Sequence, residues 1–150
     1  MLPSRHFGSV VPDNDLYVAG VLRRGEEAVR IDLNVERATS LDRAALDAVD
    51  ATLDELDALD RAARVAIEAD KNATDYWEFH RDEVEGYGHL ARTDLIAALQ
   101  LVRVGFYPDG AHGARNYVTF DYKLRGPVTD QLLVVMLMKD RTVLDVAWES

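Results

Sequence analysis

The residues best suited to metal or acid–base chemistry lie in the segment YWEFHRDEVEGYGH. Its His80 and Glu83 are three positions apart, so on a helix they would share one face. An imidazole and a carboxylate at this spacing could share a metal ion, with His89 or His6 joining from elsewhere in the chain. However, His80 also lies on an apolar stripe with Trp77, which is typical of a buried histidine with hydrogen-bonded ring nitrogens. The metal site is therefore the secondary hypothesis, and we expect no catalytic residues, metal or cofactor.

A second polar group lies in the loop of LVRVGFYPDGAHGARNYVTFDY, between two apolar runs. Asp109 and His112 have the residue types of an acid–base pair, but no nucleophile accompanies them. Gly110 and Gly113 supply the backbone conformations that a tight connection needs. We therefore predict that residues 108–115 form the turn between two antiparallel strands and not an active site.

The spacing of apolar residues along the chain predicts the strands and helices that would position these residues. Alternating apolar residues predict strands, and apolar residues at spacings of three and four predict amphipathic helices. The expected strands are Leu16–Leu22, Glu27–Val35, Val102–Tyr107, Asn116–Leu124, Gln131–Lys139 and Thr142–Trp148. Four helices are expected. The first follows an N-cap at Thr39 or Ser40, and the second follows an N-cap at Asp57, after a break in the pattern. The third covers about Asp75 to Val84, and the fourth runs from an N-cap at Thr93 through DLIAALQL. Gly126 and Pro127 are expected to interrupt the chain before the last two strands.

This order of elements predicts the fold class. Two strands, then helices, then four strands (ββ-αααα-ββββ) indicate an α+β protein with helices packed on one face of a largely antiparallel sheet of about six strands. A length of 150 residues fits a single domain, residues 1–150. An exposed edge strand of such a sheet also permits a homodimer.

Strand alternation predicts a second, hydrated face of the sheet. If Val102, Val104 and Phe106 face the helices, their neighbours must face solvent. The resulting candidate interaction face consists of Arg30, Asp32, Arg103, Tyr107, Tyr117 and Asp121. Aromatic residues interleaved with arginine are typical of protein-binding surfaces. Cross-strand ion pairs on a solvated sheet would use the same residues, so both interpretations stay open.

Charge and composition exclude several functional classes. The net charge of −10 argues against nucleic-acid binding, which needs a basic surface. The chain has no cysteine, which removes disulfides and thiolate metal sites. The N-terminus lacks the apolar region of a signal peptide, and no run approaches the roughly 20 apolar residues of a membrane span. We therefore expect a cytoplasmic protein that is not bound to a membrane.

The negative charge is concentrated between Leu41 and Asp70. This segment holds nine acidic and three basic residues, which leaves a charge of −6. Such a segment keeps a protein in solution when it forms a hydrated helix face. The same charge would also steer a basic partner toward the helices.

Several phrases of the chain together resemble one bacterial family, the domain of unknown function 2004. They are IDLNVE (Ile31–Glu36), EFHRDEV (Glu78–Val84), LVRVGFYPDG (Leu101–Gly110), TFDYKL (Thr119–Leu124), TDQLLVV (Thr129–Val135) and the terminal WES. The resemblance spans about residues 6 to 150, and VRVGFYPDG is its most specific phrase. It implies no catalytic or binding residues. Proteins of this type look similar to the small immunity-like proteins that accompany bacterial toxins.

We therefore expect a non-enzymatic protein that binds another protein, with neutralisation of a basic toxin as one form of that role. The lack of a convergent nucleophile, base and oxyanion site in the sequence favours this expectation. The alternative is a small metal-dependent or hydrolytic enzyme centred on His80 and Glu83.

Overall fold

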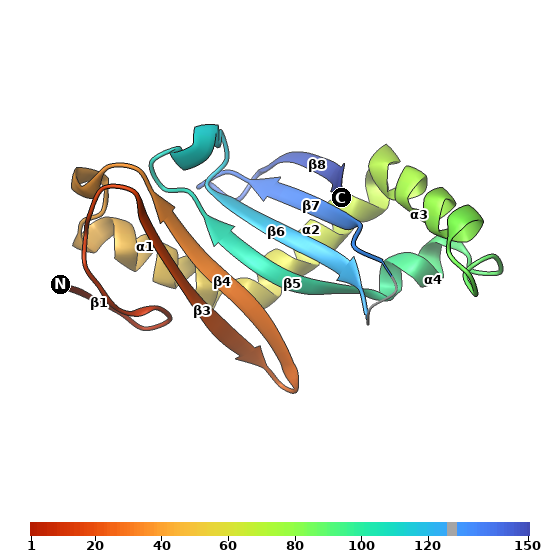
Figure 1. Cartoon of the computed structure of the whole chain (residues 1–150), viewed down its shortest axis with the longest axis horizontal. Coiled ribbons are helices and arrows are strands. Elements are labelled where there is room, and N and C mark those ends of the chain that lie inside the picture. Colours follow the sequence, from red (N-terminus) through yellow and green to blue (C-terminus); the bar gives the residue numbers. More distant parts are fainter. Residues whose placement is uncertain (126–128) are drawn as a thin grey trace.

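The computed structural model describes residues 1–125 and 129–150. Within these ranges six strands form the main sheet, in the spatial order β3-β4-β5-β6-β7-β8 (Figure 1). The strands are β3 (Leu16–Arg24), β4 (Glu27–Val35), β5 (Leu99–Phe106), β6 (Val118–Leu124), β7 (Leu132–Leu137) and β8 (Val143–Glu149). Neighbouring strands are antiparallel except β4 and β5, which are parallel. The predicted α+β class is confirmed, and the predicted order of strands and helices along the chain broadly matches.

The helices occupy the segment between β4 and β5. They are α1 (Arg43–Asp54), α2 (Leu56–Ala69), α3 (Lys71–Glu83) and α4 (Arg92–Ala97), preceded by the 3₁₀ turn η1 (Ala38–Ser40). Figure 1 shows α1 and α2 behind the sheet, whereas α3 and α4 lie toward one end of it. In the described part of the chain, no helix is both long and apolar enough to cross a membrane.

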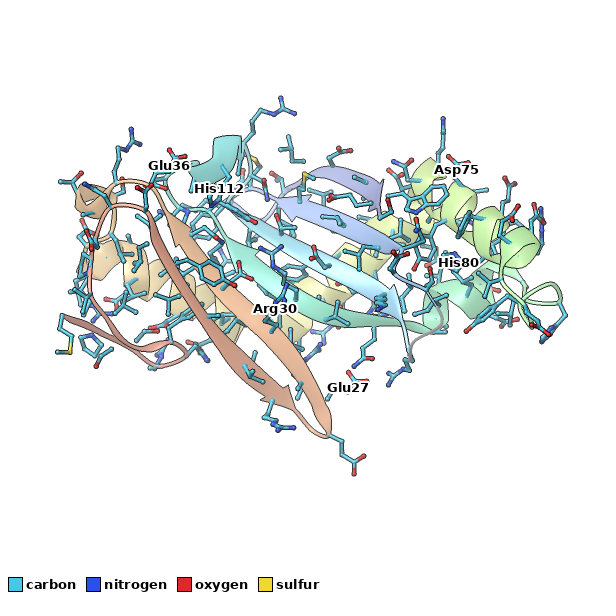
Figure 2. All side chains as sticks on the ribbon, in the orientation of Figure 1. Glu27, Arg30, Glu36, Asp75, His80 and His112 are labelled. Atoms are coloured by element: carbon cyan, nitrogen blue, oxygen red, sulfur yellow. The ribbon has the colours of Figure 1, made fainter. Side chains whose placement is uncertain are left out.

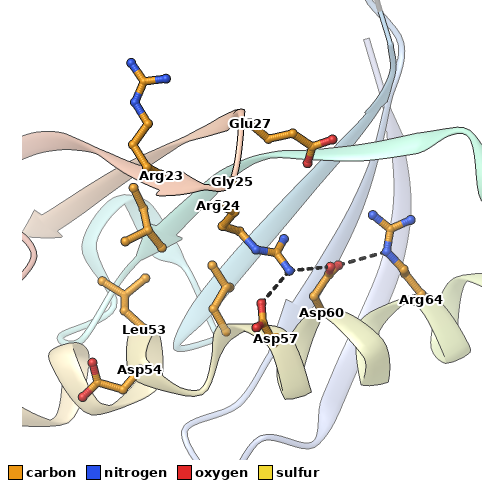
Figure 3. Close-up of a pocket in the computed structure, with 11 residues that line it drawn as sticks. Arg23, Arg24, Gly25, Glu27, Leu53, Asp54, Asp57, Asp60 and Arg64 are labelled. Carbon is orange, nitrogen blue, oxygen red and sulfur yellow. Dashed lines mark hydrogen bonds and ion pairs between the residues drawn. The ribbon is translucent and has the colours of Figure 1, made fainter.

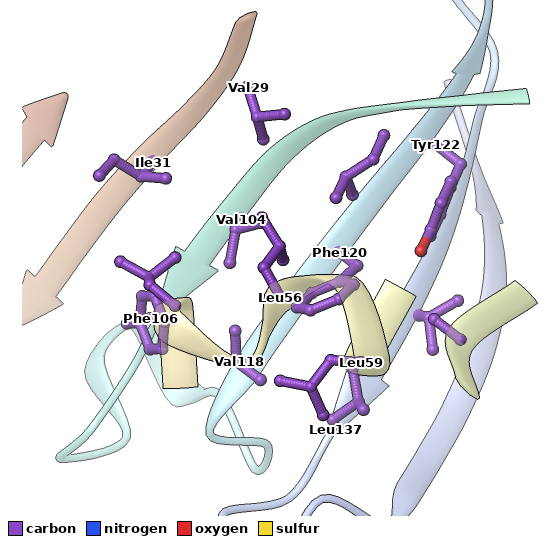
Figure 4. Packing of buried hydrophobic residues seen from close by; sticks show 14 of the residues in the cluster. Val29, Ile31, Leu56, Leu59, Val104, Phe106, Val118, Phe120, Tyr122 and Leu137 are labelled. Atoms are coloured by element: carbon purple, nitrogen blue, oxygen red, sulfur yellow. The ribbon is translucent and has the colours of Figure 1, made fainter. Parts of the chain in front are cut away.

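The hydrophobic core lies between α1, α2 and the sheet (Figure 4). Ile31, Val104 and Phe120 project from the strands and are fully buried, and Leu56 and Leu59 of α2 lie among them. Burying each large apolar side chain contributes about 1.5–3 kcal/mol. This packing fixes which face of every strand points away from the helices.

A small N-terminal hairpin was not expected from the sequence. Strands β1 (Leu2–Ser4) and β2 (Gly8–Val10) pair with each other and lie against α1. The buried carboxylate of Asp50 accepts hydrogen bonds from Ser4 Oγ (2.7 Å) and from the backbone N–H of Arg5 (3.1 Å). An acidic residue of the helical segment therefore serves to attach the hairpin.

The helix boundaries differ from the sequence-based expectations because other acidic residues provide the caps. Asp42, and not Thr39 or Ser40, caps α1 by accepting a hydrogen bond from the N–H of Ala45 (2.8 Å). Asp70 caps α3, which therefore begins at Lys71 instead of Asp75. An aspartate that accepts a hydrogen bond from a backbone N–H in the first turn satisfies a donor that has no partner within the helix.

The break between α1 and α2 falls at Glu55, so the Asp57 cap is also wrong; Asp57 lies in the first turn of α2. Helix α4 ends at Ala97, and no side chain caps it at Thr93 or elsewhere in its first turn. The following Leu99 already belongs to β5. The predicted interruption at Gly126 and Pro127 lies outside the described residues.

Candidate functional site

The side chains that point away from the helices form one continuous surface, which we call the open face. Figure 1 looks onto it, and no α-helix of residues 1–125 and 129–150 covers it. Its members are Tyr17, Val21, Arg30, Asp32, Arg103, Thr119, Asp121, Met136, Asp145 and Glu149. Arg30 is visible on this face in Figure 2.

A charged cluster occupies the centre of the open face, where β4 and β5 run parallel. The guanidinium of Arg103 donates two hydrogen bonds to Asp32, from Nε (2.6 Å) and from one terminal nitrogen (2.7 Å). The same nitrogen donates to the hydroxyl of Tyr107 (2.8 Å). Burial disfavours the charge of Arg103, but these contacts outweigh it and raise the pKa of the guanidinium. Arg103 is therefore a permanent cation in a fixed orientation.

Gly105 allows the guanidinium to lie flat across the sheet. A Cβ at this position would collide with the guanidinium of Arg103 and lie 2.9 Å from a carboxylate oxygen of Asp32. In the strand register Gly105 is the partner of Asp32, so the arginine covers the space that a side chain would occupy. Glycine is required here for close approach and not for its backbone conformation.

Asp121 belongs to the same cluster but is much less well paired. Only 8% of its surface is exposed, and its single hydrogen bond from the described residues comes from Arg103 over 3.4 Å. Burial is the main cause that raises the pKa of this carboxyl, and the negative charges of Glu149 and Asp32 add to it against the effect of Arg103. A carboxyl whose pKa is shifted by burial and by specific charged neighbours is a candidate for a functional group when it lies in a cleft.

Asp121 lies in a pocket of about 360 Å³ on the open face. Polar residues lining it are Arg103, Tyr107, Asn116, Thr119, Asp121 and Glu149. Its apolar lining consists of Val134, Met136 and Leu144, and residues 112–115 of the β5–β6 loop form the remaining wall. This volume falls within the roughly 300–1,000 Å³ of small-ligand sites.

The β5–β6 loop connects antiparallel neighbours, as predicted, and it is anchored to the segment after β4. The carboxylate of Asp109 accepts hydrogen bonds from the backbone N–H groups of Glu36 (3.0 Å) and Arg37 (2.9 Å). Although burial opposes it, these bonds lower the pKa of Asp109. The backbone N–H of His112 donates to Glu36 (3.0 Å), and Figure 2 shows the two residues side by side. Asp109 thus fixes the loop against the segment that follows β4, and the loop forms one wall of the pocket.

Tyr117 is a correction to the candidate interaction face. Its ring packs edge-on against the fully buried Phe106 (5.7 Å between centroids) and lies beside Lys139, on the helix side of the sheet. It lines a separate cavity with residues near the start of α1. The alternation that the sequence suggested is interrupted between Asn116 and Val118, so Asn116 takes the position on the open face. The other five predicted residues lie on that face or at its rim.

A second irregularity shifts β5. The strand register changes between Leu101 and Arg103, so Leu101 is fully buried while Val102, expected to face the helices, is only half-buried. The extra residue of this bulge puts Leu101 on the helix side, whereas Arg103 keeps the alternation with Val104 and Phe106 and lies on the open face, between Arg30 and Asp121 in the register.

His80 and Glu83 do not converge on a shared site. The imidazole of His80 is fully buried, and its Nδ1 donates to the carbonyl of Tyr76 (2.7 Å). It stacks on the ring of Tyr76, with 4.2 Å between centroids. Desolvation lowers the pKa of His80, so the ring is neutral at pH 7. Glu83 is exposed at the end of α3, and the described residues contain no group of three or more histidine, cysteine or acidic side chains that could hold a metal.

A larger cavity, of about 550 Å³, lies between β3 and α2 (Figure 3). At its base the buried Asp60 accepts hydrogen bonds from Arg64 Nε (3.1 Å), Arg24 (3.2 Å) and the hydroxyl of Tyr122 (2.6 Å). Arg24 also donates to Asp57 (2.8 Å), as the dashed lines in Figure 3 show. These contacts satisfy Asp60 from within the chain and tie α2 to the sheet.

Most acidic residues between Leu41 and Asp70 have similar structural roles. Besides the capping, hairpin and Asp60 contacts, Asp47 pairs with Arg43, Asp54 with Arg5 and His6, and Glu55 with Arg141. Three arginines from outside the segment, Arg5, Arg24 and Arg141, therefore offset about half of its net charge of −6.

Comparison of the chain with family models, curated proteins and solved structures found no significant match in any of the three. The resemblance to the domain of unknown function 2004 stays a prediction.

Proposed function

We propose that this chain is a non-enzymatic binding protein that contacts a basic protein partner through the open face. The observation that supports this function best is the position of the Arg103–Asp32–Asp121 cluster: it lies on the sheet face that the helices leave uncovered, and Arg103 and Asp121 line a pocket there. Neutralisation of a basic toxin is the form of this role that the sequence resemblance suggests.

The residues around the pocket are suited to protein recognition. Tyr17 and Val21 of the edge strand β3 are 60% and 61% exposed on this face, although both are large and apolar. Tyrosine and arginine dominate binding energies at protein interfaces, and here Arg103 is already held in place by Asp32 and Tyr107. A preorganised surface loses less conformational entropy on binding.

Site-specific photo-crosslinking tests this function. A photoreactive phenylalanine analogue replaces Val21 on the open face, and a matched variant carries it at Val65, which is 68% exposed on the helix α2. Both proteins are expressed in the native host and irradiated. We expect one protein to be captured in stoichiometric amount from position 21 and not from position 65.

Two results would contradict the proposed function. Capture of the same protein from both positions, or from position 65 alone, would place the partner elsewhere. Capture of a second copy of this chain from position 21 would instead indicate the homodimer through the edge strand β3.

The enzymatic alternative at His80 and Glu83 has less support. Only Nε2 of His80 remains for a ligand, and the ring is fully buried beside Tyr76 and Phe79. That nitrogen is buried without a hydrogen-bond partner among the described residues, which contain no group of three or more side chains that could hold a metal.

A further inference from the structure

The floor of the open-face pocket presents acceptor oxygens that the described residues leave without donors. Asp121 uses one carboxylate oxygen in the long contact with Arg103, and its Oδ1 accepts no hydrogen bond from residues 1–125 or 129–150. Glu149, also in the lining, has no ion pair or hydrogen bond through its carboxylate within the same ranges.

Asn116 adds a third acceptor, because its amide group can have only one orientation. Its nitrogen donates to the carbonyl of Val118 (2.9 Å) and to the hydroxyl of Thr119 (2.7 Å). A carbonyl only accepts hydrogen bonds, so the amide nitrogen must face Val118. Both N–H groups are thereby used, and the side-chain oxygen is the part of Asn116 left over. The residue is only 7% exposed and lines the pocket.

The charge around these acceptors is also incompletely balanced. The two buried carboxylates, Asp32 and Asp121, share one part-buried cation, Arg103, which gives its two shortest carboxylate contacts to Asp32; Glu149 lies at the exposed rim. Arg115 also lines the pocket, but it is exposed at the rim, where water screens its charge. A ligand that brings both N–H donors and positive charge would complete the site.

The apolar side of the pocket limits the shape of such a ligand. Val134, Met136 and Leu144 line the same pocket, and in the strand register Val134 is the neighbour of Asp121 and Met136 that of Thr119. Lysine and arginine side chains combine a charged head with a methylene stem that packs on apolar surface. A compact inorganic cation has no part that would use this wall.

We infer that the open-face pocket binds a lysine or arginine side chain of the partner protein, with its charged head between Asp121, Asn116 and Glu149. This inference rests on the proposed function and names the group that the open face recognises. The methylene stem of that side chain packs on Met136 and Leu144.

The test is a titration of the ¹⁵N-labelled protein followed by NMR, with Nα-acetyl-lysine-N-methylamide and Nα-acetyl-arginine-N-methylamide as probes. An isolated side chain should bind with a dissociation constant on the order of millimolar. We expect chemical-shift changes at the amides of Thr119 and Asp121 and at the side-chain amide of Asn116.

Two control compounds separate the contributions. Nα-acetyl-norleucine-N-methylamide has the stem without the ammonium, and tetramethylammonium has the charge without N–H donors. Neither should shift these resonances at matched concentration and ionic strength. Equal shifts from either control, or no shifts from the two cationic probes, would overturn the inference.

Variants locate the binding site. Asp121→Asn should weaken binding of the lysine probe at least about tenfold. Glu149→Gln, at an exposed position of β8, should weaken it by a smaller factor. Asp145→Asn is the matched control, because Asp145 is an exposed acid on the same face outside the pocket lining. Unchanged binding in both pocket variants would also overturn the inference.

The two proposals fail in different ways. Crosslinking from position 21 without binding of either cationic probe would leave the protein-binding function standing and remove the pocket from it. Binding of the probes without any crosslink from position 21 would leave a cation site and contradict the protein-binding function.

Discussion

Asp60 and Asp121 are both carboxylates largely removed from solvent, each beside an arginine, yet their surroundings differ sharply. Asp60, between α2 and the sheet, accepts hydrogen bonds from Tyr122, Arg64 and Arg24, all within 3.2 Å. Asp121, on the open face, has one contact from the described residues, at 3.4 Å. The first cluster is complete and the second is not.

The difference follows from what surrounds each carboxylate. Asp60 lies where helix meets sheet, so its donors must come from the chain itself, and a missing donor would cost stability. Asp121 lies on a face that another molecule can reach. A carboxylate there retains unused acceptors at modest cost, and these acceptors can serve recognition.

The comparison is tested most strongly by the same substitution at both positions. Asp60→Asn removes the charge that balances Arg24 and Arg64, so the free energy of unfolding should fall by about 3 kcal/mol. Asp121→Asn removes an underpaired charge and should change it by less than about 1 kcal/mol. Urea unfolding followed by circular dichroism measures both. Equal losses in the two variants would show that Asp121 is as structural as Asp60.

Gly105→Ala tests whether the Arg103 cluster is held in place by packing. The new methyl group displaces the guanidinium and leaves Asp32, only 1% exposed, without its main donor. We expect a loss of about 2 kcal/mol in the free energy of unfolding. The matched control is Gly88→Ala, where the nearest atom to a new Cβ is 3.7 Å away. If Asp32→Asn fails to reduce the effect of Gly105→Ala, the clash acts through something other than the ion pair.

The smallest expected effect is a dependence on pH. Because the pKa of Asp121 is raised above its ordinary value of 3.8, the folded protein binds a proton there more readily than the unfolded chain. Ionised Asp121 therefore opposes folding, and this cost appears as the pH rises from below 3.8 through the folded-state pKa. The stability of Asp121→Asn relative to wild type should increase over that window and then level off. A relative stability that stays constant or decreases would contradict the raised pKa.

Much of the fold was predictable because the apolar residues that repeat at strand or helix spacing are also the residues that are buried. The alternation in Val29, Ile31 and Leu33 gives a strand with one buried side, and the spacing of Leu46, Val49 and Leu53 gives an amphipathic helix. The open face then follows by elimination, and it correctly includes Arg30, Asp32, Arg103 and Asp121.

The errors come from residues whose placement depends on contacts distant in sequence. Tyr117 alternates like a solvent-facing residue, but the strand is irregular before Val118 and the ring packs on Phe106. Asp42 caps α1 and Asp70 caps α3, whereas the sequence offered other N-cap residues that were equally plausible. In a segment rich in aspartate, local preference cannot decide which carboxylate caps and which pairs.

Parts of the pocket had no usable signal in the sequence. Gly105 looks like an ordinary strand glycine until the guanidinium of Arg103 is seen above it. Asn116 gains its role only because the β5–β6 loop folds over the open face, and that depends on the bonds from Glu36 and Arg37 to Asp109. A polar asparagine just before an apolar strand was the one hint available.

The single parallel pairing in the main sheet has a consequence for how the protein folds. The hairpin β3–β4 and the meander β5–β8 each form from contacts close in sequence, whereas β4 meets β5 only across the whole helical segment. Asp32 and Arg103, which are 71 positions apart, join across this seam. Pairings of such long range form late, because the chain entropy of closing the loop is lost before the contacts repay it. A nascent or partly unfolded chain therefore has both halves of the cluster but no assembled site, so the recognition that we propose for the open face requires that β4 and β5 have paired.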